Sequence, residues 1–267
     1  MFSINTETEM AEYKNCVIFF LDILGFKEII EHNKISVDEM LKKFDNAEYH
    51  LDYTRWISKR KTEEIKWAKN KEKDYLQVSD SIILSFPLET PSGLFYTILD
   101  VMRLQANFAA LHGIFLRGAC TCGDLYHKNT TIFGPAMNKV VSMEKVAKYP
   151  RVIIPNKVIT ECSKYSSQID YDARDEEKDI ISCLKMDNDG YYYIDYISYD
   201  TFGSEVDSNE QWAAYIKELK KQIKIGLYDQ VALDKYMWLK EKYNNTVTDN
   251  IIKNYREKDG IILSRIK

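Results

Sequence analysis

The amino-acid sequence predicts a mixed α/β (α+β) fold, in which helices pack on an antiparallel-rich sheet and a helical extension follows. Residues 16–21 form an unbroken apolar run rich in β-branched and aromatic side chains, which is typical of a buried central strand. Residues 75–78 and 82–86 are two further strand-like runs with only three residues between them, which indicates a hairpin. From about residue 209 the chain is polar, carries aromatic residues throughout and has a helical pattern.

The remaining elements follow from hydrophobic spacing and from turn residues. Proline is favoured in the first turn of a helix and glycine just after its end, so these residues delimit two of the predicted helices. The predicted order is a strand at 16–21, a helix at 35–50, strands at 75–78 and 82–86, a helix at 91–113, a strand at 114–126, a helix from 134 to 149, a strand at 151–154, a helix at 156–165, two strands within 180–197 around Asn188-Asp189-Gly190, and helices from 209 onward.

Length and composition divide the chain into a main domain, expected at 1–204, and a helical C-terminal extension at 205–267. With 267 residues the chain is long enough to bury a substantial core. Residues 51–74 are a charged insertion in which Trp56 and Trp67 alternate with lysine and arginine. This insertion is either a basic flap over a polyanion or a solvated helical segment, and its interspersed acidic residues favour the second interpretation.

The charge and cysteine content exclude several functional classes. A formal charge of −4 argues against nucleic-acid binding, which usually requires a basic surface. Neither a secretory signal nor an apolar run of bilayer length is visible, so we expect no membrane association. Five cysteines, an odd number, favour a reducing cytoplasmic location. Cys120 and Cys122 lack the spacing of a zinc site and are interpreted as small buried strand residues.

Two acidic residues stand where predicted strands end. Asp22 follows the first strand directly, and Asp80 lies at the tip of the predicted hairpin. If these strands pair, the two carboxylates face each other, which is costly unless a cation bridges them. Mg²⁺ and Mn²⁺ prefer such oxygen ligands. The alternative is that Asp22 caps the following helix and Asp80 only forms the turn, and local chemistry does not separate the two interpretations.

A glycine follows Asp22 at the point where the strand becomes a helix, within Ile23-Leu24-Gly25-Phe26. Backbone N–H groups at such a turn suit the binding of a triphosphate. Together with the paired carboxylates, this turn predicts phosphoryl transfer assisted by two divalent metal ions.

Three stretches of the sequence resemble the class III nucleotidyl cyclases. "FFLDILGFKEI" is similar to their first-strand motif, "LQVSDSIILSF" to the hairpin that carries the second metal aspartate, and "FLRGACTCGDLYHKNTTIFGPAMNKVVSMEKVAKYPRVIIP" to a later strand, turn and helix. The resemblance covers about residues 15–200 in the same order. It implies a ferredoxin-like core and a head-to-head homodimer with active sites shared across the interface.

The resemblance also implies roles for individual residues, which we state as expectations. Asp22 and Asp80 would bind two Mg²⁺ or Mn²⁺ ions, helped by the carbonyl group of Ile23. Leu24, Gly25 and Phe26 would bind phosphates through their backbone. Asn138 would orient the ribose from the partner chain.

The sequence departs from purine cyclases at the positions that read the base. Leu76 stands where purine cyclases place a lysine or glutamate, and Pro135 stands at the partner's base-reading position. Ser142 replaces the arginine that stabilises the transition state, and Asp124 replaces a phosphate-binding arginine. Purine recognition of the familiar kind is therefore not expected.

These departures resemble one branch, the pyrimidine cyclases of bacterial anti-phage (Pycsar) defence, through "FGPAMN", "KYPRVII" and "DNDGYYYIDYI". The resemblance implies conversion of UTP or CTP into a 3′,5′-cyclic monophosphate. Arg117 and Arg151 become candidates for phosphate contacts, with an ordinary salt bridge as the alternative for each. A nucleotide-binding sensor without turnover, a purine cyclase and a polymerase-like palm remain alternative functions.

Overall fold

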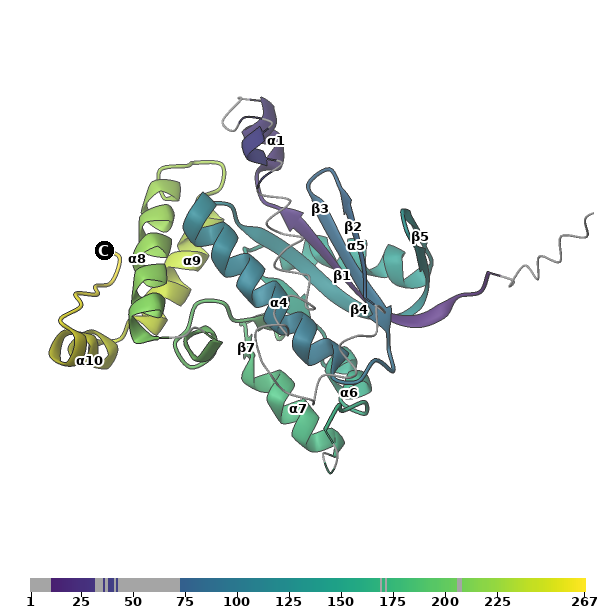
Figure 1. Ribbon diagram of the computed structural model, residues 1–267. Coiled ribbons are helices and arrows are strands. Elements are labelled where there is room, and N and C mark those ends of the chain that lie inside the picture. Colours follow the sequence, from purple (N-terminus) through teal and green to yellow (C-terminus); the bar gives the residue numbers. More distant parts are fainter. Residues whose placement is uncertain are drawn as a thin grey trace, which may run out of the picture.

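The computed structural model describes residues 11–31, 36, 38–40, 42, 73–168, 170, 172–205 and 208–267. The protein is a mixed α/β structure in which helices cover a twisted sheet, as the sequence predicted (Figure 1). Residues 51–72 of the predicted insertion and most of the helix predicted at 35–50 lie outside the described residues. The end of the predicted insertion was wrong, because Asp74 is the first residue of the strand that follows it.

The described strands form one sheet in the order β2-β3-β1-β4-β6-β8-β7, with β5 paired to β4. β1 lies at its centre and runs antiparallel to both β3 and β4, and β2 runs antiparallel to β3. The order β2-β3-β1-β4 with these directions is the ferredoxin-like arrangement. The strands are β1 (Lys14–Ile23), β2 (Asp74–Val78), β3 (Ser81–Pro87), β4 (Leu116–Lys128), β5 (Thr131–Phe133), β6 (Val152–Ile154), β7 (Leu184–Met186) and β8 (Tyr192–Ile194).

Helices cover both faces of the sheet. Successive residues of a strand point to opposite faces, and Val17, Ile18 and Phe19 of β1 are all fully buried, so both faces are covered there. In Figure 1, α4 crosses in front of the sheet and α5 lies behind it. The described helices are α1 (Phe26–Glu31), α4 (Gly93–Asn107), α5 (Pro135–Ala147), α6 (Asn156–Cys162), α7 (Ala173–Ser182), α8 (Asn209–Gly226), α9 (Leu233–Thr246), α10 (Asp249–Asp259), the π-helical turn Phe108–His112 and the 3₁₀ turn Phe202–Glu205.

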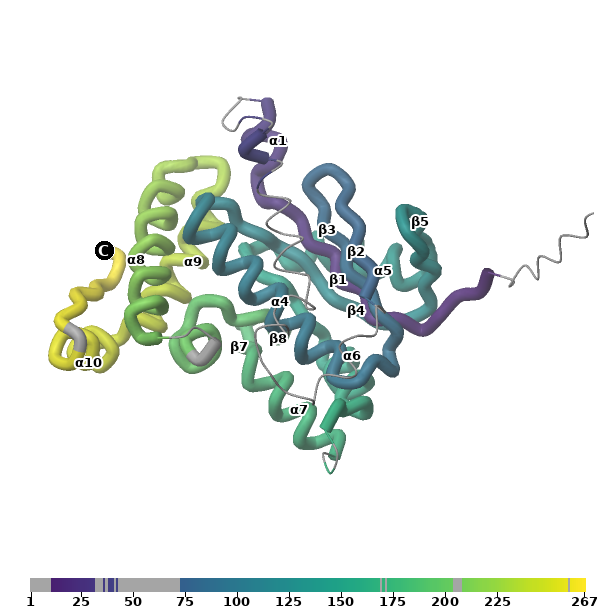
Figure 2. Tube along the Cα trace, in the orientation of Figure 1, coloured from purple at the N-terminus to yellow at the C-terminus, as the bar shows by residue number. Residues whose placement is uncertain are grey.

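The C-terminal helices pack beside this core. The tube in Figure 2 shows α8, α9 and α10 together at one end of the molecule, with the chain returning past them. Trp212, Ile223 and Leu239 from these helices are buried within the same hydrophobic cluster as β1 and α4. The segment predicted as an extension thus shares the core of the main domain.

The sequence prediction was wrong for part of the 180–197 segment. Ile180 and Ile181 close the last turn of α7 rather than beginning a strand. Asp172 caps this helix by accepting hydrogen bonds from the amides of Arg174 and Asp175, so the helix is started by a local signal upstream of the apolar pair. The short β5 strand was also not predicted.

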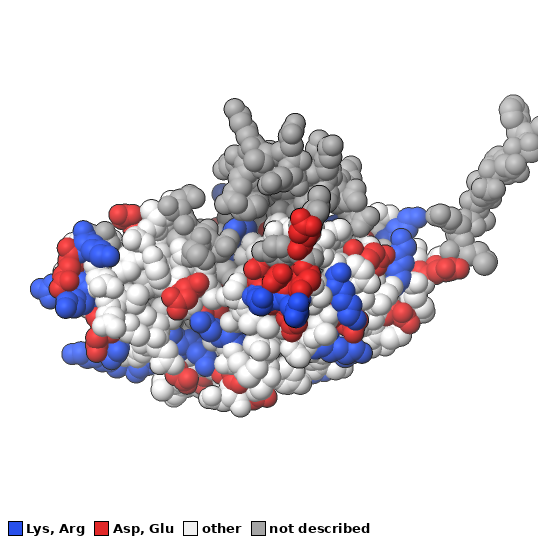
Figure 3. All heavy atoms as spheres, turned by 90° about the horizontal axis from the view of Figure 1, so that it is seen from below, with Lys and Arg blue, Asp and Glu red and all other residues white. Residues whose placement is uncertain are grey.

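Acidic and basic side chains are interspersed over the described part of the face shown in Figure 3. Several charged side chains of the described residues pair along single helices, as Lys178 does with Asp175 at 2.9 Å. None of the described helices has the length and apolarity needed to cross a bilayer.

Candidate functional site

Asp22 lies near the end of the central strand, between two neighbouring strands. In the sheet it stands opposite Ser81 of β3 on one side and Arg117 of β4 on the other. The apolar run before it is buried on both sides of the sheet, so the strand carries the carboxylate to the edge of the core while leaving its side chain 17% exposed. The predicted position of Asp22 is confirmed.

The hairpin brings Asp80 next to Asp22, also as predicted. The amide of Ile23 donates a hydrogen bond of 3.1 Å to the carbonyl oxygen of Asp80. This bond fastens the tip of the β2–β3 hairpin to the end of β1. Ser79, the residue before Asp80, adopts a left-handed conformation with a φ of 57°, which turns the chain sharply at this point.

The local environment opposes ionisation of Asp22. Burial is the main cause, and the neighbouring carboxylates of Asp80 and Glu144 add to it, whereas Arg117 acts in the opposite direction; together they raise the pKa of Asp22 to about 7. The protonated form of this carboxyl group is therefore favoured more strongly than in water when no cation is bound. A positive charge placed between Asp22 and Asp80 would restore its ionised form.

Arg117 is directly attached to this pair of acids. One guanidinium nitrogen lies 3.2 Å from Oδ2 of Asp22, and the Nε atom forms an ion pair with Glu144. The structure therefore places the predicted Arg117 in the candidate site, where its guanidinium joins two carboxylates. Both interpretations of Arg117 still apply, because a residue 28% exposed beside the acids is able to meet a phosphate as well.

Glu144 is a member of this cluster that the sequence reasoning missed. It is 5% exposed and lies on α5 in the same buried stripe as Ala136, Val140 and Ala147. These positions recur at helical spacing, so a single acid within an otherwise apolar stripe was the available signal. A buried carboxylate requires a partner, and Arg117 provides it.

The turn after Asp22 is built as the sequence indicated, with one difference. Gly25 adopts a φ of 75°, which favours glycine, and no atom lies within 4 Å of the position that a Cβ would occupy. The amide of Leu24, however, donates a hydrogen bond of 2.9 Å to the carbonyl oxygen of Phe115. Of the three predicted phosphate-binding amides, those of Gly25 and Phe26 are therefore the better candidates.

A cavity of about 430 Å³ opens beside this turn. Leu24, Gly25 and Ile29 line this cavity together with Tyr236 and Leu239 of α9. The C-terminal helices thus reach the segment that follows Asp22.

The remaining predicted residues lie on β2 and on α5. Leu76 is half-buried on β2, opposite Ile83, and Pro135 begins α5 with its side chain exposed. Asn138 is exposed in the first turns of α5, where a partner molecule could reach it. Their shared use in one site depends on a second chain and stays a prediction.

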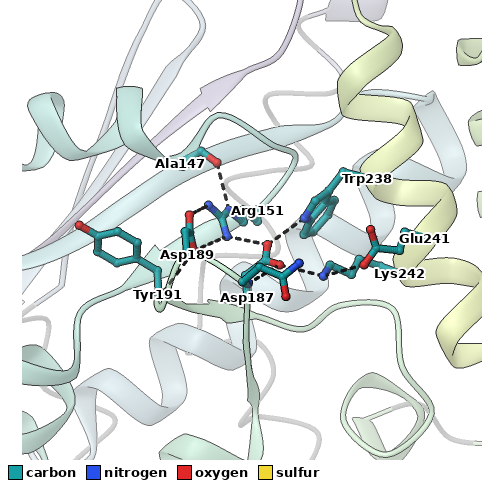
Figure 4. A network of polar contacts seen from close by, with 9 residues as sticks. Ala147, Arg151, Asp187, Asp189, Tyr191, Trp238, Glu241 and Lys242 are labelled. Atoms are coloured by element: carbon teal, nitrogen blue, oxygen red, sulfur yellow. Dashed lines mark hydrogen bonds and ion pairs between the residues drawn. The ribbon is translucent and has the colours of Figure 1, made fainter.

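Arg151 takes the salt-bridge role that was the alternative for it. Its side chain is 1% exposed, and its guanidinium contacts Asp187 and Asp189, while its Nε donates to the carbonyl oxygen of Ala147 (Figure 4). These partners enclose the guanidinium, so it is held away from a phosphate.

The donor set at the end of β1 fits a hard divalent cation. Mg²⁺ is commonly held by one or two carboxylates and fills its other positions with water and phosphate oxygens. Asp22 and Asp80 provide two carboxylates, and burial, together with the nearby negative charges of Asp80 and Glu144, raises the pKa of Asp22. Within the described ranges no cluster of three or more His, Cys, Asp or Glu side chains could enclose a metal ion. A bound ion would thus depend on Asp22, Asp80 and the Ile23 carbonyl, with oxygens of water and substrate.

The chain is similar in structure to several solved proteins. No protein-family model and no curated protein sequence matches the chain. A bacterial light-regulated adenylyl cyclase is 18% identical with a TM-score of 0.40, over 55% of this chain and 78% of that chain. The adenylyl cyclase CyaB from P. aeruginosa is 16% identical with a TM-score of 0.38, over 56% of this chain and 81% of that chain. The guanylyl cyclase Cya2 is 12% identical with a TM-score of 0.38, over 57% of this chain and 80% of that chain. Similarities this low assign no activity to the chain.

Proposed function

We propose that the protein is a nucleotidyl cyclase that converts a pyrimidine nucleoside triphosphate, UTP or CTP, into its 3′,5′-cyclic monophosphate and diphosphate. The observation that carries the proposal is the pairing of Asp22 and Asp80 at adjacent strand ends, next to the turn at Gly25. The motif resemblance adds the expectation of Mg²⁺ or Mn²⁺, a homodimer and a cytoplasmic role in anti-phage signalling.

In this reaction the ribose 3′ oxygen attacks the α-phosphorus, the bond from that phosphorus to the β-bridging oxygen breaks, and diphosphate leaves with the electron pair. The proton of the 3′ hydroxyl passes to solvent. Divalent cations, when bound, acidify that hydroxyl and neutralise the triphosphate. Asp22 and Asp80 would hold the cations, and the amides of Gly25 and Phe26 would orient the phosphates.

Arg117 supplies positive charge at the place where negative charge develops. It already lies 3.2 Å from Asp22, and Glu144 holds its Nε from the other side. Arg117 would face the phosphates, while Asp22 and Asp80 would hold the cations. This role suits an arginine, whose guanidinium forms several directed hydrogen bonds with phosphate oxygens.

The preference for a pyrimidine rests on the two base-reading positions. Leu76 offers no hydrogen bond, and Pro135 has neither a polar side chain nor an amide donor. Purine edges left unpaired in a buried site cost about 1–3 kcal/mol each. Gln77 and Tyr75 flank Leu76 on β2, but their side chains, joined by a hydrogen bond of 3.3 Å, point to the opposite face of the strand. A smaller base beside Leu76 would therefore be read by backbone groups.

The test is incubation of the protein with each of the four nucleoside triphosphates and Mn²⁺, with products identified by mass spectrometry. We expect turnover of UTP or CTP to exceed that of ATP and GTP by at least about tenfold, the effect of one specifying contact. UTP is the first choice. Equal or faster turnover of ATP would contradict the pyrimidine assignment and leave a purine cyclase. Long oligonucleotide products would indicate a polymerase-like palm.

One observation favours a second candidate, a nucleotide-binding sensor without turnover. Arg151 is enclosed by Asp187 and Asp189, and Ser142 stands where class III cyclases place the arginine that stabilises the transition state. Of the two predicted arginines, Arg117 is therefore the one that lies at Asp22. Saturable binding of a triphosphate, measured by calorimetry, without any cyclic product would identify the sensor.

A further inference from the structure

A buried polar cluster joins the C-terminal helix α9 to the end of α5. Asp187, in the turn between β7 and β8, is its centre (Figure 4). Its Oδ2 accepts hydrogen bonds from Arg151 at 2.6 Å and from the indole nitrogen of Trp238 at 2.8 Å. Its Oδ1 accepts one from Lys242 at 2.9 Å. Two residues of α9 thus share one carboxylate with Arg151.

Arg151 carries this attachment to α5. Its Nε donates a hydrogen bond of 3.0 Å to the carbonyl oxygen of Ala147, the last residue of α5. The last four carbonyl groups of a helix receive no hydrogen bond from within the helix. The contact from Arg151 therefore supplies a donor to the final turn of α5 and holds it in place. The ring of Tyr149, just beyond the helix, also stacks on Trp238 at 5.8 Å with an angle of 6° between the rings.

The final turn of α5 also carries Glu144, three residues before Ala147. Glu144 pairs with Arg117, and Arg117 contacts Asp22. A continuous series of polar contacts and one helical turn therefore connects α9 to the candidate metal-binding acid. Packed side chains and ion pairs of this kind can transmit a displacement between distant sites.

We infer that Asp187 is a positioning residue through which α9 holds the end of α5 in place. By holding α5, it also keeps Glu144 and Arg117 in contact with each other and Arg117 in contact with Asp22. The effect on turnover rests on the proposed function, whereas the effect on α5 does not. The cluster is buried, with 1% exposure at Arg151 and 6% at Trp238, so removal of one partner is not compensated by water.

The chain offers a matched control between the same two helices. Lys148, just after α5, pairs with Asp234 of α9 at 3.4 Å, but both side chains are more than half exposed. Exposed pairs contribute little because water and salt screen them. Asp234→Asn therefore removes a contact between α5 and α9 without opening the buried cluster.

The experiment compares Trp238→Phe, Lys242→Met, Lys242→Arg and Asp234→Asn in the full chain. Trp238→Phe removes one hydrogen bond and keeps an aromatic ring, so we expect the fold to be retained. Hydrogen exchange followed by mass spectrometry reports on α9 and on residues 138–147 separately. We expect faster exchange in both segments for Trp238→Phe and Lys242→Met, and near wild-type exchange for Lys242→Arg and Asp234→Asn.

The kinetic measurement separates positioning from general stability. At saturating nucleotide and Mn²⁺, kcat should fall by about fivefold or more in Trp238→Phe and Lys242→Met, with KM changed by less than about twofold. Faster exchange confined to α9, with residues 138–147 unchanged, would overturn the inference. If the wild type yields no cyclic product, the proposed function fails, and the exchange pattern still decides the inference.

Discussion

At the scale of single residues, the side chain of Asp22 carries the chemistry of the candidate site. It is half-buried beside Asp80 and Glu144, and Arg117 offsets only part of that negative charge. A carboxylate in this setting is unfavourable for folding, and a divalent cation would relieve the cost. Two predictions follow from this conflict.

The first concerns catalysis. Asp22→Asn and Asp80→Asn each remove one charge from the proposed cation site, so cyclisation should fall by at least about a hundredfold, or about 2.7 kcal/mol in the activation barrier. Circular dichroism should show an unchanged fold. Asp249→Asn, at an exposed site on α10, is the control and should keep its activity. Near wild-type turnover in either variant would contradict the assignment of the two acids.

The second concerns pH, in the presence of EDTA. Because the pKa of Asp22 is raised from 3.8 to about 7, the folded protein binds more protons than the unfolded chain between these values. The free energy of unfolding therefore decreases as the pH rises through this window. Asp22→Asn removes this term, so the Tm of the variant relative to wild type should increase from pH 4.5 to pH 8. A constant difference in Tm across that range would show that Asp22 ionises normally. Asp249→Asn again serves as control.

At the scale of elements, the close pairing of β1 with β4 holds Arg117 opposite Asp22. Gly118 follows Arg117 on β4 and faces Leu21 across the pair. A Cβ at Gly118 would lie 2.4 Å from the carbonyl oxygen of Phe20, a backbone atom that cannot move without displacing β1. The strand pair thus requires glycine at this position for its close approach.

We therefore expect Gly118→Ala to destabilise the protein by about 1–3 kcal/mol, as overpacking does in a tight core. Chemical denaturation monitored by fluorescence gives the free energy of unfolding. Lys128→Ala, at the exposed end of the same strand, should change it by less than about 0.5 kcal/mol. If the free energy of unfolding of Gly118→Ala equals that of the wild type, β1 and β4 move apart at this position without an energetic cost, and the requirement for glycine is wrong.

At the scale of the whole molecule, the proposed site needs a second copy of the chain. Asn138 is exposed on α5, and the resemblance implies that it serves the partner's acids. A two-fold symmetric dimer contains two such sites, and each combines the acids of one chain with Asn138 of the other.

Mixing an Asp22→Asn chain with an Asn138→Ala chain should then restore activity. Each heterodimer has one site in which both mutations fall and one site with neither, so up to half of the wild-type activity per heterodimer is expected. Each variant alone should be inactive. No recovery in purified heterodimers, verified by differently tagged chains, would exclude a site shared in this way.

The sequence by itself determined the position of Asp22 and Asp80, because strand ends and hairpin tips are local properties. The apolar run 16–21 and the three residues between the predicted strands 75–78 and 82–86 placed the two carboxylates at a strand end and at a hairpin tip. That they meet follows from the pairing of β1 with β3 in the tertiary structure. Only the tertiary structure decided the partners of the arginines. Arg117 meets Glu144 and Arg151 meets Asp187 across 27 and 36 residues of chain, and both acids lie on faces that depend on how α5 and the β7–β8 turn pack. No local pattern records such pairings, since the requirement of a buried charge for a partner does not specify which partner the fold brings near.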